Sequence, residues 1–315
     1  MAEIKEPIEK YGLSKKDKPK ALFSKVGIVG CGSVGQSIAI MISCRGIDVV
    51  FIELSEGRIE QALNEISLEL DNMINHWGMT PADKRSILSR VKGTMRYRDL
   101  LGCDLVIESI LSKESDSLES RKEVFKDIEK YVDSETIIAT NSSTVVITEL
   151  SSELQYKNRC VSLHISTTAP DTDLIEVARG LYTSDEVYQN VLKFVKLLGK
   201  KVVPVSEAPG LISVRLFAAL INEALEVLME GVGSLEDIDL VMKRGFGLSL
   251  GPFEMADKIG LDKVLQYLDN LYEEFGDRKY KPNPLLKRLV RANHFGRKTG
   301  EGFYHYDAKG KKISK

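Results

Sequence analysis

The sequence predicts an α/β, Rossmann-like N-terminal domain with an inserted helical hairpin, followed by an all-α C-terminal domain. Two observations predict the α/β part: short apolar runs alternate with helical patterns from Lys25 onward, and a glycine-rich turn follows the first run. A third predicts the helical part, because the strand pattern ends after Ala208-Pro209-Gly210. We therefore divide the 315 residues into a polar extension (1–24), the Rossmann-like domain (25–207) and the helical domain (208–315).

The first elements alternate between strand and helix. We expect a strand at 26–29, a helix at 33–45 that Gly46 ends, and a second strand at 48–53. Residues 56–90 then have a helical period with a break at Gly78. Thr80 and Asp83 have the spacing of a capping box, and Pro81 suits the first helical position. This segment therefore predicts the inserted helical hairpin.

The remaining elements divide at residue 208. Further strands are expected at 104–108, 136–140, 159–165 and 201–206. Helices of the second domain are expected at 211–231, 234–244 and 252–275. Apolar stretches such as 211–228 exceed what a domain of this size buries alone, and they favour a homodimer formed mainly through 210–290.

Composition excludes several classes of protein. A net charge of −2 provides no overall positive field for nucleic acid or for an anionic membrane. Four widely spaced cysteines without a C-x-x-C pair argue against bound metal and disulfides, and fit a reducing compartment. The N-terminus lacks the apolar core of a signal peptide, and no apolar run reaches the length of a membrane span. We expect a cytoplasmic protein.

The glycine-rich turn indicates a dinucleotide site. Gly30, Gly32 and Gly35 form a G-x-G-x-x-G that follows a strand and opens a helix, so its backbone can approach a pyrophosphate at the helix N-terminus. Glu53 ends the second strand, where a carboxylate binds ribose hydroxyls and repels a 2′-phosphate. The alternative is a structural turn with a surface glutamate. We favour NAD as cofactor, in preference to NADP.

Among four histidines, only His164 ends an expected sheet strand, at the edge where ligand sites form. Glu176 follows 12 residues later in a second apolar run, and the connection can bring the two together. Oxidation of an alcohol needs a base for the hydroxyl proton, and a carboxylate can fix the imidazole tautomer and stabilise its cation. A structural histidine at a strand end is an equally good interpretation of the spacing alone.

From residue 25 to 306 the chain resembles the 3-hydroxyacyl-CoA dehydrogenase family. The motifs that carry the resemblance are the glycine-rich turn, DLVIES (104–109), TNSST (140–144) with ITEL (147–150), the histidine–glutamate spacing, PG (209–210), NEAL (222–225), EDID (236–239), GPFEMAD (251–257), IGLD (259–262) and GRKTGEGFY (296–304). The family has a Rossmann-like domain with a helical hairpin and a helical dimerisation domain, as the residues themselves predict.

The resemblance implies a role for individual residues. His164 matches the general base, Glu176 its partner and Ser143 the serine whose hydroxyl meets the substrate oxygen. The positions implied to bind or lie near the cofactor are Gly30, Gly32, Ser33, Val34, Gly35, Glu53, Asp116, Arg121, Asn141 and Lys298. The alternatives are that Ser143 caps the ITEL segment and that Lys298 is a solvated turn residue.

Four departures from the family pattern concern the substrate. Thr167 and Val214 stand where the family has asparagines, and the segment between Glu108 and Phe125 is about four residues longer. In the hairpin, Glu69 and His76 stand where a serine and a lysine contact CoA in the family. The first hairpin helix is acidic, which disfavours the phosphates of CoA.

The combined interpretation is an NAD-dependent enzyme of fatty acid metabolism. It would interconvert a 3-hydroxyacyl and a 3-oxoacyl thioester by hydride transfer, and the resemblance implies that the thioester is one of CoA. Two alternatives stay open: a dehydrogenase of another 3-hydroxy acid or carrier-bound acyl group, and a catalytically weak NAD-binding protein. Retention of His164, Glu176 and Ser143 argues against the second alternative.

Overall fold

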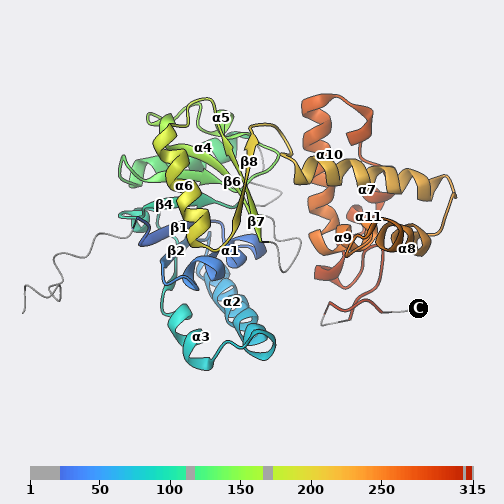
Figure 1. Cartoon of the computed structure of the whole chain (residues 1–315), viewed down its shortest axis with the longest axis horizontal. Coiled ribbons are helices and arrows are strands. Elements are labelled where there is room, and N and C mark those ends of the chain that lie inside the picture. Colours follow the sequence, from blue (N-terminus) through green and yellow to red (C-terminus); the bar gives the residue numbers. More distant parts are fainter. Residues whose placement is uncertain (1–21, 111–117, 166–172, 308–309, 314–315) are drawn as a thin grey trace, which may run out of the picture.

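A computed structural model describes residues 22–110, 118–165, 173–307 and 310–313. Residues 1–21 of the expected N-terminal extension lie outside these ranges. The chain forms a sheet with helices around it, and a separate group of helices built from the C-terminal part (Figure 1). This arrangement confirms the predicted fold class.

One eight-stranded sheet forms the centre of the first part. Its order is β3-β2-β1-β4-β5-β6-β7-β8, and all neighbours run parallel except β6 and β7. The strands are β1 (Lys25–Val29), β2 (Asp48–Ile52), β3 (Val91–Thr94), β4 (Leu105–Glu108), β5 (Ile137–Thr140), β6 (Cys160–His164), β7 (Leu174–Arg179) and β8 (Lys201–Ser206). The order in which strands are added to the sheet reverses between β1 and β4, and these two parallel strands end at the same edge of the sheet.

The sequence-based list of strands lacked β3 and β7. The β3 segment has only four residues, includes Gly93 and pairs with β2 alone at the rim of the sheet, so it carries little periodic signal. The β7 segment is the second apolar run after His164, and it pairs antiparallel with β6. Its pairing follows from a chain reversal that the pattern of apolar residues does not reveal.

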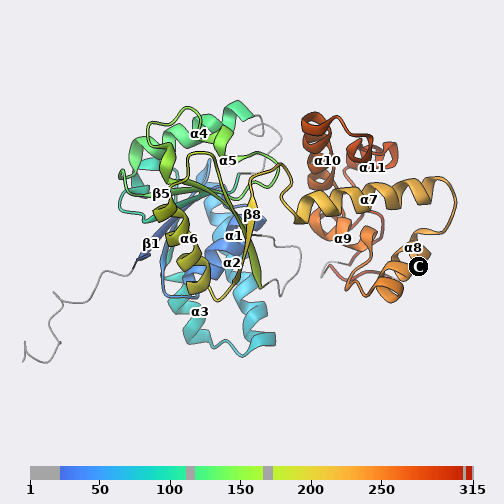
Figure 2. The ribbon, with the colours of Figure 1, turned by 45° about the horizontal axis from the view of Figure 1, so that its top comes forward.

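Helices cover both faces of the sheet. They are α1 (Ser33–Ser43), α2 (Glu56–Trp77), α3 (Pro81–Leu88), α4 (Leu118–Tyr131), α5 (Ile147–Leu150) and α6 (Asp185–Leu197), with short 3-10 turns η2 (Tyr97–Leu100) and η3 (Lys157–Arg159). Apolar side chains of α1, α2 and α6 pack on one face, and those of α4 and α5 on the other. Figure 2 shows these helices around the sheet. Two apolar layers therefore hold the strand ends in place.

The α2–α3 pair is the predicted hairpin. Gly78 ends α2 with a φ of +74°, and Thr80 and Asp83 form the expected capping box at the start of α3. The side chain of His76 is outside what the structure describes. Of the acidic side chains on α2, Glu65 accepts hydrogen bonds from Gln36 and Gln61, and Asp71 pairs with Lys84.

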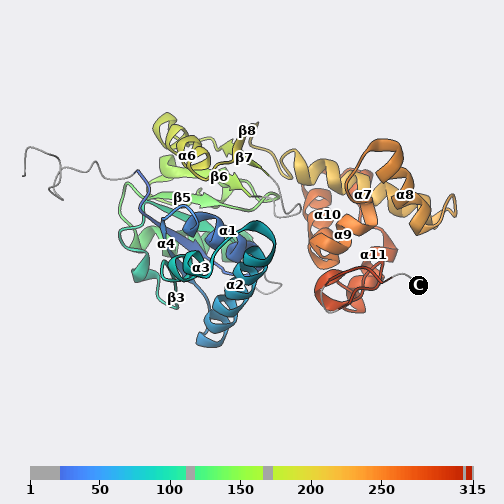
Figure 3. The ribbon, with the colours of Figure 1, turned by 60° about the horizontal axis from the view of Figure 1, so that its bottom comes forward.

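The C-terminal part is helical, and α7 enters it directly after β8 (Figure 3). Its elements are α7 (Ser213–Met229), α8 (Leu235–Phe246), α9 (Pro252–Ile259), α10 (Leu261–Phe275), η4 (Arg278–Tyr280), α11 (Pro284–Arg291) and η5 (Arg297–Thr299). The single helix expected at 252–275 is wrong: Gly260, with a φ of +102°, divides it into α9 and α10. The division turns α10 so that its residues reach the sheet domain.

Candidate active site

The glycine-rich turn joins β1 to α1 with the geometry that its residues require. Gly30 has a φ of +89°, and a Cβ on Gly35 would lie 2.3 Å from the carbonyl oxygen of Gly30. A Cβ on Gly32, in contrast, would meet nothing within 4 Å, so the backbone is open there. Ser33 and Val34 begin α1. The turn therefore combines an accessible backbone with a helix N-terminus, which fits a dinucleotide pyrophosphate.

Glu53 lies directly after β2, beside this turn. Its Oε1 accepts a hydrogen bond of 2.7 Å from the backbone N–H of Cys31, and its Oε2 lies 3.9 Å from the guanidinium of Arg58. The two contacts hold the carboxylate at the strand edge next to the turn. This is the position that a ribose-binding acid needs.

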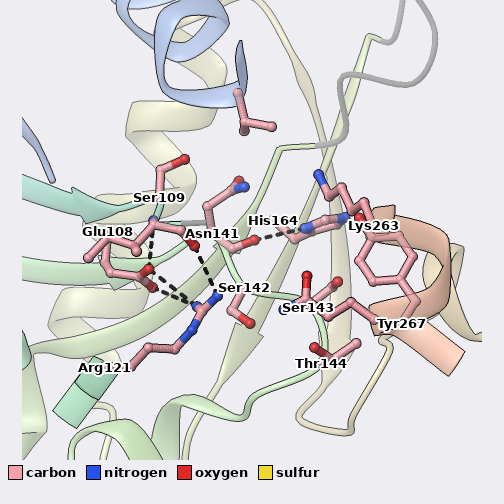
Figure 4. A pocket seen from close by; sticks show the side chains of 13 residues that line it. Glu108, Ser109, Arg121, Asn141, Ser142, Ser143, Thr144, His164, Lys263 and Tyr267 are labelled. Carbon is pink, nitrogen blue, oxygen red and sulfur yellow. Dashed lines mark hydrogen bonds and ion pairs between the residues drawn. The ribbon is translucent and has the colours of Figure 1, made fainter. Parts of the chain in front are cut away.

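A cavity of about 40 Å³ lies between the carboxyl edge of the sheet and α10 (Figure 4). The residues that line it are Val34, Glu108, Ser109, Ile110, Arg121, Asn141, Ser142, Ser143, Thr144, His164, Lys263, Gln266 and Tyr267. Regions far apart in the sequence thus meet here: the strand ends, the loop after β5, one residue each of α1 and α4, and the first two turns of α10.

His164 ends β6 and is buried in the wall of this cavity. Its Nδ1 lies 3.0 Å from the carbonyl oxygen of Asn141, and because a carbonyl only accepts, Nδ1 carries the proton. Nε2 is then left with a lone pair. Burial is the main cause that lowers the pKa of His164 below its ordinary value, and the charge of Lys263 lowers it further. The neutral imidazole is the favoured form.

Glu176 stands opposite His164 on β7, in register with it. Its carboxylate accepts hydrogen bonds from the backbone N–H groups of Ile212 and Ser213, at 2.9 and 3.2 Å, and from the Ser213 hydroxyl at 2.5 Å. Its charge raises the pKa of His164 against the effect of burial. The sequence led us to expect that Glu176 fixes the imidazole tautomer; in the structure the Asn141 carbonyl does so. Glu176 instead ties the sheet to the start of α7.

The loop after β5 brings Ser143 to the same cavity as His164 (Figure 4). Ser143 is buried, and its carbonyl accepts a hydrogen bond of 2.6 Å from Gly210 at the boundary of the two parts. Asn141, two residues earlier in the chain, accepts a 2.8 Å bond from the Ile165 N–H through its side-chain oxygen. Asn141 thus holds the end of β6 through two bonds.

A buried ion pair forms the opposite wall. Arg121 of α4 lies 3.2 Å from Glu108 at the end of β4 and also donates to the Ile110 carbonyl at 3.0 Å. Glu108 accepts further bonds from the Ile110 N–H and the Thr140 hydroxyl. The sequence indicated Arg121, whereas it assigned no role to Glu108. The signal that could have identified Glu108 is its place as an acidic residue at the end of the DLVIE strand.

Other candidates lie elsewhere. The Lys298 ammonium pairs with Asp262 at 2.5 Å, and Lys298 is not among the described residues that line the cavity. Val214 is buried in the helical core. Asp116 and Thr167 lie outside the described residues. Conversely, the cavity is also lined by Lys263, Gln266 and Tyr267, which no motif marked. The amphipathic pattern of this helix predicts its apolar face but not which part of the protein packs against it.

Among the described residues, the four cysteines are free thiols, and no group of three or more metal-ligating side chains could hold a metal ion. None of the described helices has the length and hydropathy to cross a membrane.

Comparisons with known proteins agree with this geometry. Residues 25–208 match the family model "3-hydroxyacyl-CoA dehydrogenase, NAD binding domain", and residues 210–306 match "3-hydroxyacyl-CoA dehydrogenase, C-terminal domain". The chain is 36% identical over 283 residues to the 3-hydroxybutyryl-CoA dehydrogenase of Clostridioides difficile, covering 90% of this chain and 99% of the relative.

Two solved structures share the architecture. The (S)-3-hydroxybutyryl-CoA dehydrogenase of Ralstonia eutropha is 37% identical with a TM-score of 0.80, covering 90% of this chain and 99% of that one. FadB2 of M. tuberculosis is 28% identical with a TM-score of 0.85, over the same shares of the two chains. Both similarities extend across the sheet and the helical part.

Proposed function

The chain belongs to the 3-hydroxyacyl-CoA dehydrogenase family and is an NAD-dependent oxidoreductase, and we propose that it interconverts a 3-hydroxyacyl and a 3-oxoacyl thioester with His164 as general base. Such a reaction belongs to fatty acid metabolism. The acyl group is short in the curated relatives, whose names specify 3-hydroxybutyryl-CoA.

The observation that carries this proposal is the state of His164. Its Nδ1–H is held by the Asn141 carbonyl and its pKa is lowered by burial, so Nε2 is an unprotonated acceptor in a cavity that also contains Ser143. A base of this kind accepts the hydroxyl proton when the alcohol is oxidised, and returns it in the reverse direction. Bound NAD supplies the acceptor for the hydride.

Ser143 and Glu176 would assist from two sides. Ser143, in the loop after β5, lines the cavity. From there its hydroxyl can donate a hydrogen bond to the reacting oxygen of the substrate and orient that oxygen toward His164. Glu176 stabilises the imidazolium that forms, because its negative charge faces the ring from β7. Its bonds to the start of α7 also link this charge to the helical part.

The residues proposed for the cofactor follow the edge of the sheet. The backbone of Gly30, Gly32 and Gly35, with Ser33 and Val34 at the start of α1, would bind the pyrophosphate, and Glu53 the adenosine ribose. Arg121 and Asn141 would line the nicotinamide end, since both border the cavity. We retain Asp116 and Lys298 as cofactor-side positions on the resemblance alone.

We also propose that the protein is a homodimer formed through the helical part. Large apolar side chains are exposed near the connection of α7 to α8 and along α8: Met229, Val232, Leu240, Val241 and Phe246. Two of them, Val232 and Val241, line an apolar groove of about 380 Å³ between these helices. A soluble chain rarely leaves such a patch open, so a second copy is the occupant we propose.

An assay with acetoacetyl-CoA and NADH tests the proposed function. The wild-type protein should reduce this thioester, and His164→Gln should lower kcat by about 100- to 10,000-fold, because a positioned base contributes that much. The dissociation constant for NADH should stay nearly unchanged in the variant, and His305→Gln, an exposed histidine, is the matched control. Near-normal turnover by His164→Gln would refute the assignment of the base.

A further inference from the structure

Lys263 places a positive charge in the cavity beside His164, and the described residues form no salt bridge with it. The proposed reaction of an uncharged acyl chain has no use for this charge. We propose that Lys263 binds a carboxylate of the substrate, so that the preferred substrate carries a carboxylate a few bonds from the carbon that is oxidised. The inference rests on the proposed function, since it concerns the same cavity.

The position of Lys263 depends on the start of α10. Gly260 ends α9 and begins α10, which places Lys263, Gln266 and Tyr267 on the helix face toward the sheet domain. The Thr144 hydroxyl and the Asn270 amide, 2.9 Å apart, hold α10 against the loop after β5. In Figure 4 Lys263 and Tyr267 lie on the same side of the cavity as His164, across from Arg121. Lys263 is therefore at the substrate side of the base.

Within the part of the chain that the structure describes, no salt bridge neutralises the Lys263 ammonium. Its neighbour Asp262 is paired with Lys298 at 2.5 Å. The contact that the structure gives the Lys263 ammonium is with the Tyr267 ring, 5.7 Å from the ring centre, and the described residues include no salt bridge from Lys263. A lysine on a cavity wall without an acid partner is suited to bind an anion.

The other charges of the cavity cancel. Glu108 and Arg121 form a buried pair, and the lowered pKa of His164 keeps the imidazole neutral. The described lining residues therefore carry one net positive charge, from Lys263. The direction of its effect on His164 agrees with close approach, because its charge lowers the pKa of that ring. A substrate anion would restore neutrality.

The place of Lys263 in the cavity favours a carboxylate over a phosphate of the CoA handle. Lys263 and the base His164 line the same cavity, so an anion bound at Lys263 lies close to the reacting carbon, whereas the phosphates lie at the far end of the CoA handle. The Gln266 amide, on the next turn of α10 from Lys263, adds a hydrogen-bond donor to the same wall. Two sources of the carboxylate are possible: the far end of a dicarboxylic acyl chain, and the acid group of a free 3-hydroxy acid.

The experiment compares three substrates with NAD: 3-hydroxybutyryl-CoA, 3-hydroxyglutaryl-CoA and free 3-hydroxybutyrate. We expect the wild-type kcat/KM to be higher for one of the two carboxylates than for 3-hydroxybutyryl-CoA. Lys263→Met should lower that preference by about 10- to 100-fold, as expected for the loss of a charge-assisted hydrogen bond. Lys263→Arg should restore part of it, and Lys193→Met, an exposed lysine of α6, should leave the preference unchanged.

The outcomes separate the two hypotheses. If Lys263→Met folds, judged by an unchanged melting temperature, but changes kcat/KM for all substrates by the same factor, the carboxylate proposal is overturned and the proposed function stands. If the wild type oxidises only the free acid and this depends on Lys263, the carboxylate proposal is supported and the thioester is wrong. If 3-hydroxyglutaryl-CoA is the substrate that depends on Lys263, both hold. No turnover of any of the three overturns both.

Discussion

His164 obtains its chemical state from two neighbours that come from different strands. The carbonyl of Asn141, after β5, fixes the proton on Nδ1, while Glu176 on β7 acts through its charge and raises the pKa of the ring. Glu176 has its own hydrogen bonds to Ile212 and Ser213 and does not hold the His164 tautomer. A substitution of Glu176 can therefore remove its charge without changing the tautomer of His164, and the pH dependence of the reaction then reports the effect of that charge.

The first prediction at this scale is that Glu176→Gln shifts the pH profile of alcohol oxidation toward lower pH. The glutamate charge raises the pKa of His164, so its removal lowers that pKa further, and the base stays unprotonated in more acidic solution. The measurement is kcat/KM against pH. Ser213→Ala, which removes a hydrogen bond but keeps the charge, is the control. A shift toward higher pH would contradict the assignment.

The second prediction concerns Glu53. Glu53→Ala should weaken binding of NADH by about tenfold or more and reduce the discrimination against NADPH, since the carboxylate that meets the ribose is lost. Isothermal titration with both cofactors measures this. Glu56→Ala changes an exposed acid nearby on α2 and should have little effect. Equal or stronger wild-type binding of NADPH would be incompatible with the proposed ribose site.

At the scale of elements, the C-terminal segment 296–306 is held to α9 by one buried carboxylate. Asp257 accepts bonds from the Phe303 and Tyr304 N–H groups and from the Tyr306 hydroxyl, each at 2.9 Å. A Cβ on Gly302 would lie 2.1 Å from this carboxylate, so glycine is required there. The same segment carries Lys298, which reaches Asp262 at the start of α10. The GRKTGEGFY motif therefore supports the helix that bears Lys263.

Asp257 leads to the third prediction. Burial raises its pKa to about 6 from 3.8, so its ionisation is less favourable in the folded chain. Its contribution to stability is complete below about pH 4 and is lost as the pH rises through about 6, by about 3 kcal/mol. The free energy of unfolding of the wild type, minus that of Asp257→Asn, should therefore fall between pH 4 and pH 7 in urea titrations.

Asp277→Asn is the control for this experiment. Hydrogen bonds from Lys279 hold the pKa of the exposed Asp277 carboxyl below its usual range. Its contribution is present at neutral pH and lost as the pH falls, so the difference between wild type and variant should rise with pH. For Asp257→Asn, the free energy of unfolding of the wild type minus that of the variant should fall with pH. If it rises instead, the folded chain favours ionised Asp257 and the prediction is wrong.

For the whole molecule, the cavity exists only because the two parts of the chain are joined. Hydrogen bonds connect them, including those of Asn270 with Thr144, of Gly210 with the Ser143 carbonyl, and of Ser213 with Glu176. Each contact involves a residue of the cavity or its direct neighbour. The proposed reaction therefore depends on the position of the helical part, which the proposed homodimer would stabilise.

The fourth prediction is that the protein sediments as a dimer at micromolar concentration. The double variant Val241→Asp/Phe246→Asp should shift it toward monomer, because both side chains are largely exposed on α8 and charges would be buried on association. Leu181→Asp, equally exposed on the sheet domain, should stay dimeric. A wild-type monomer under these conditions would refute the dimer.

Local sequence determined a large part of this protein. The strand, glycine turn and helix at 25–43, the Thr80–Asp83 capping box and the change to helices after β8 follow from interactions between near neighbours in the chain. His164 could be indicated because it ends a strand, and Ser143 and Arg121 through the family resemblance; the structure brings all three to one cavity.

Only the tertiary structure decided what surrounds those residues. The spacing in the sequence was enough to pair Glu176 with His164. It could not predict the bonds of Glu176 to residues 212 and 213, because these bonds depend on where α7 begins. Lys263 comes 99 positions after His164, and its helix changes direction at Gly260, so no local pattern places its charge beside the base. Side-chain periodicity specifies which face of an element is apolar, whereas the partner of that face is decided by packing across the whole chain.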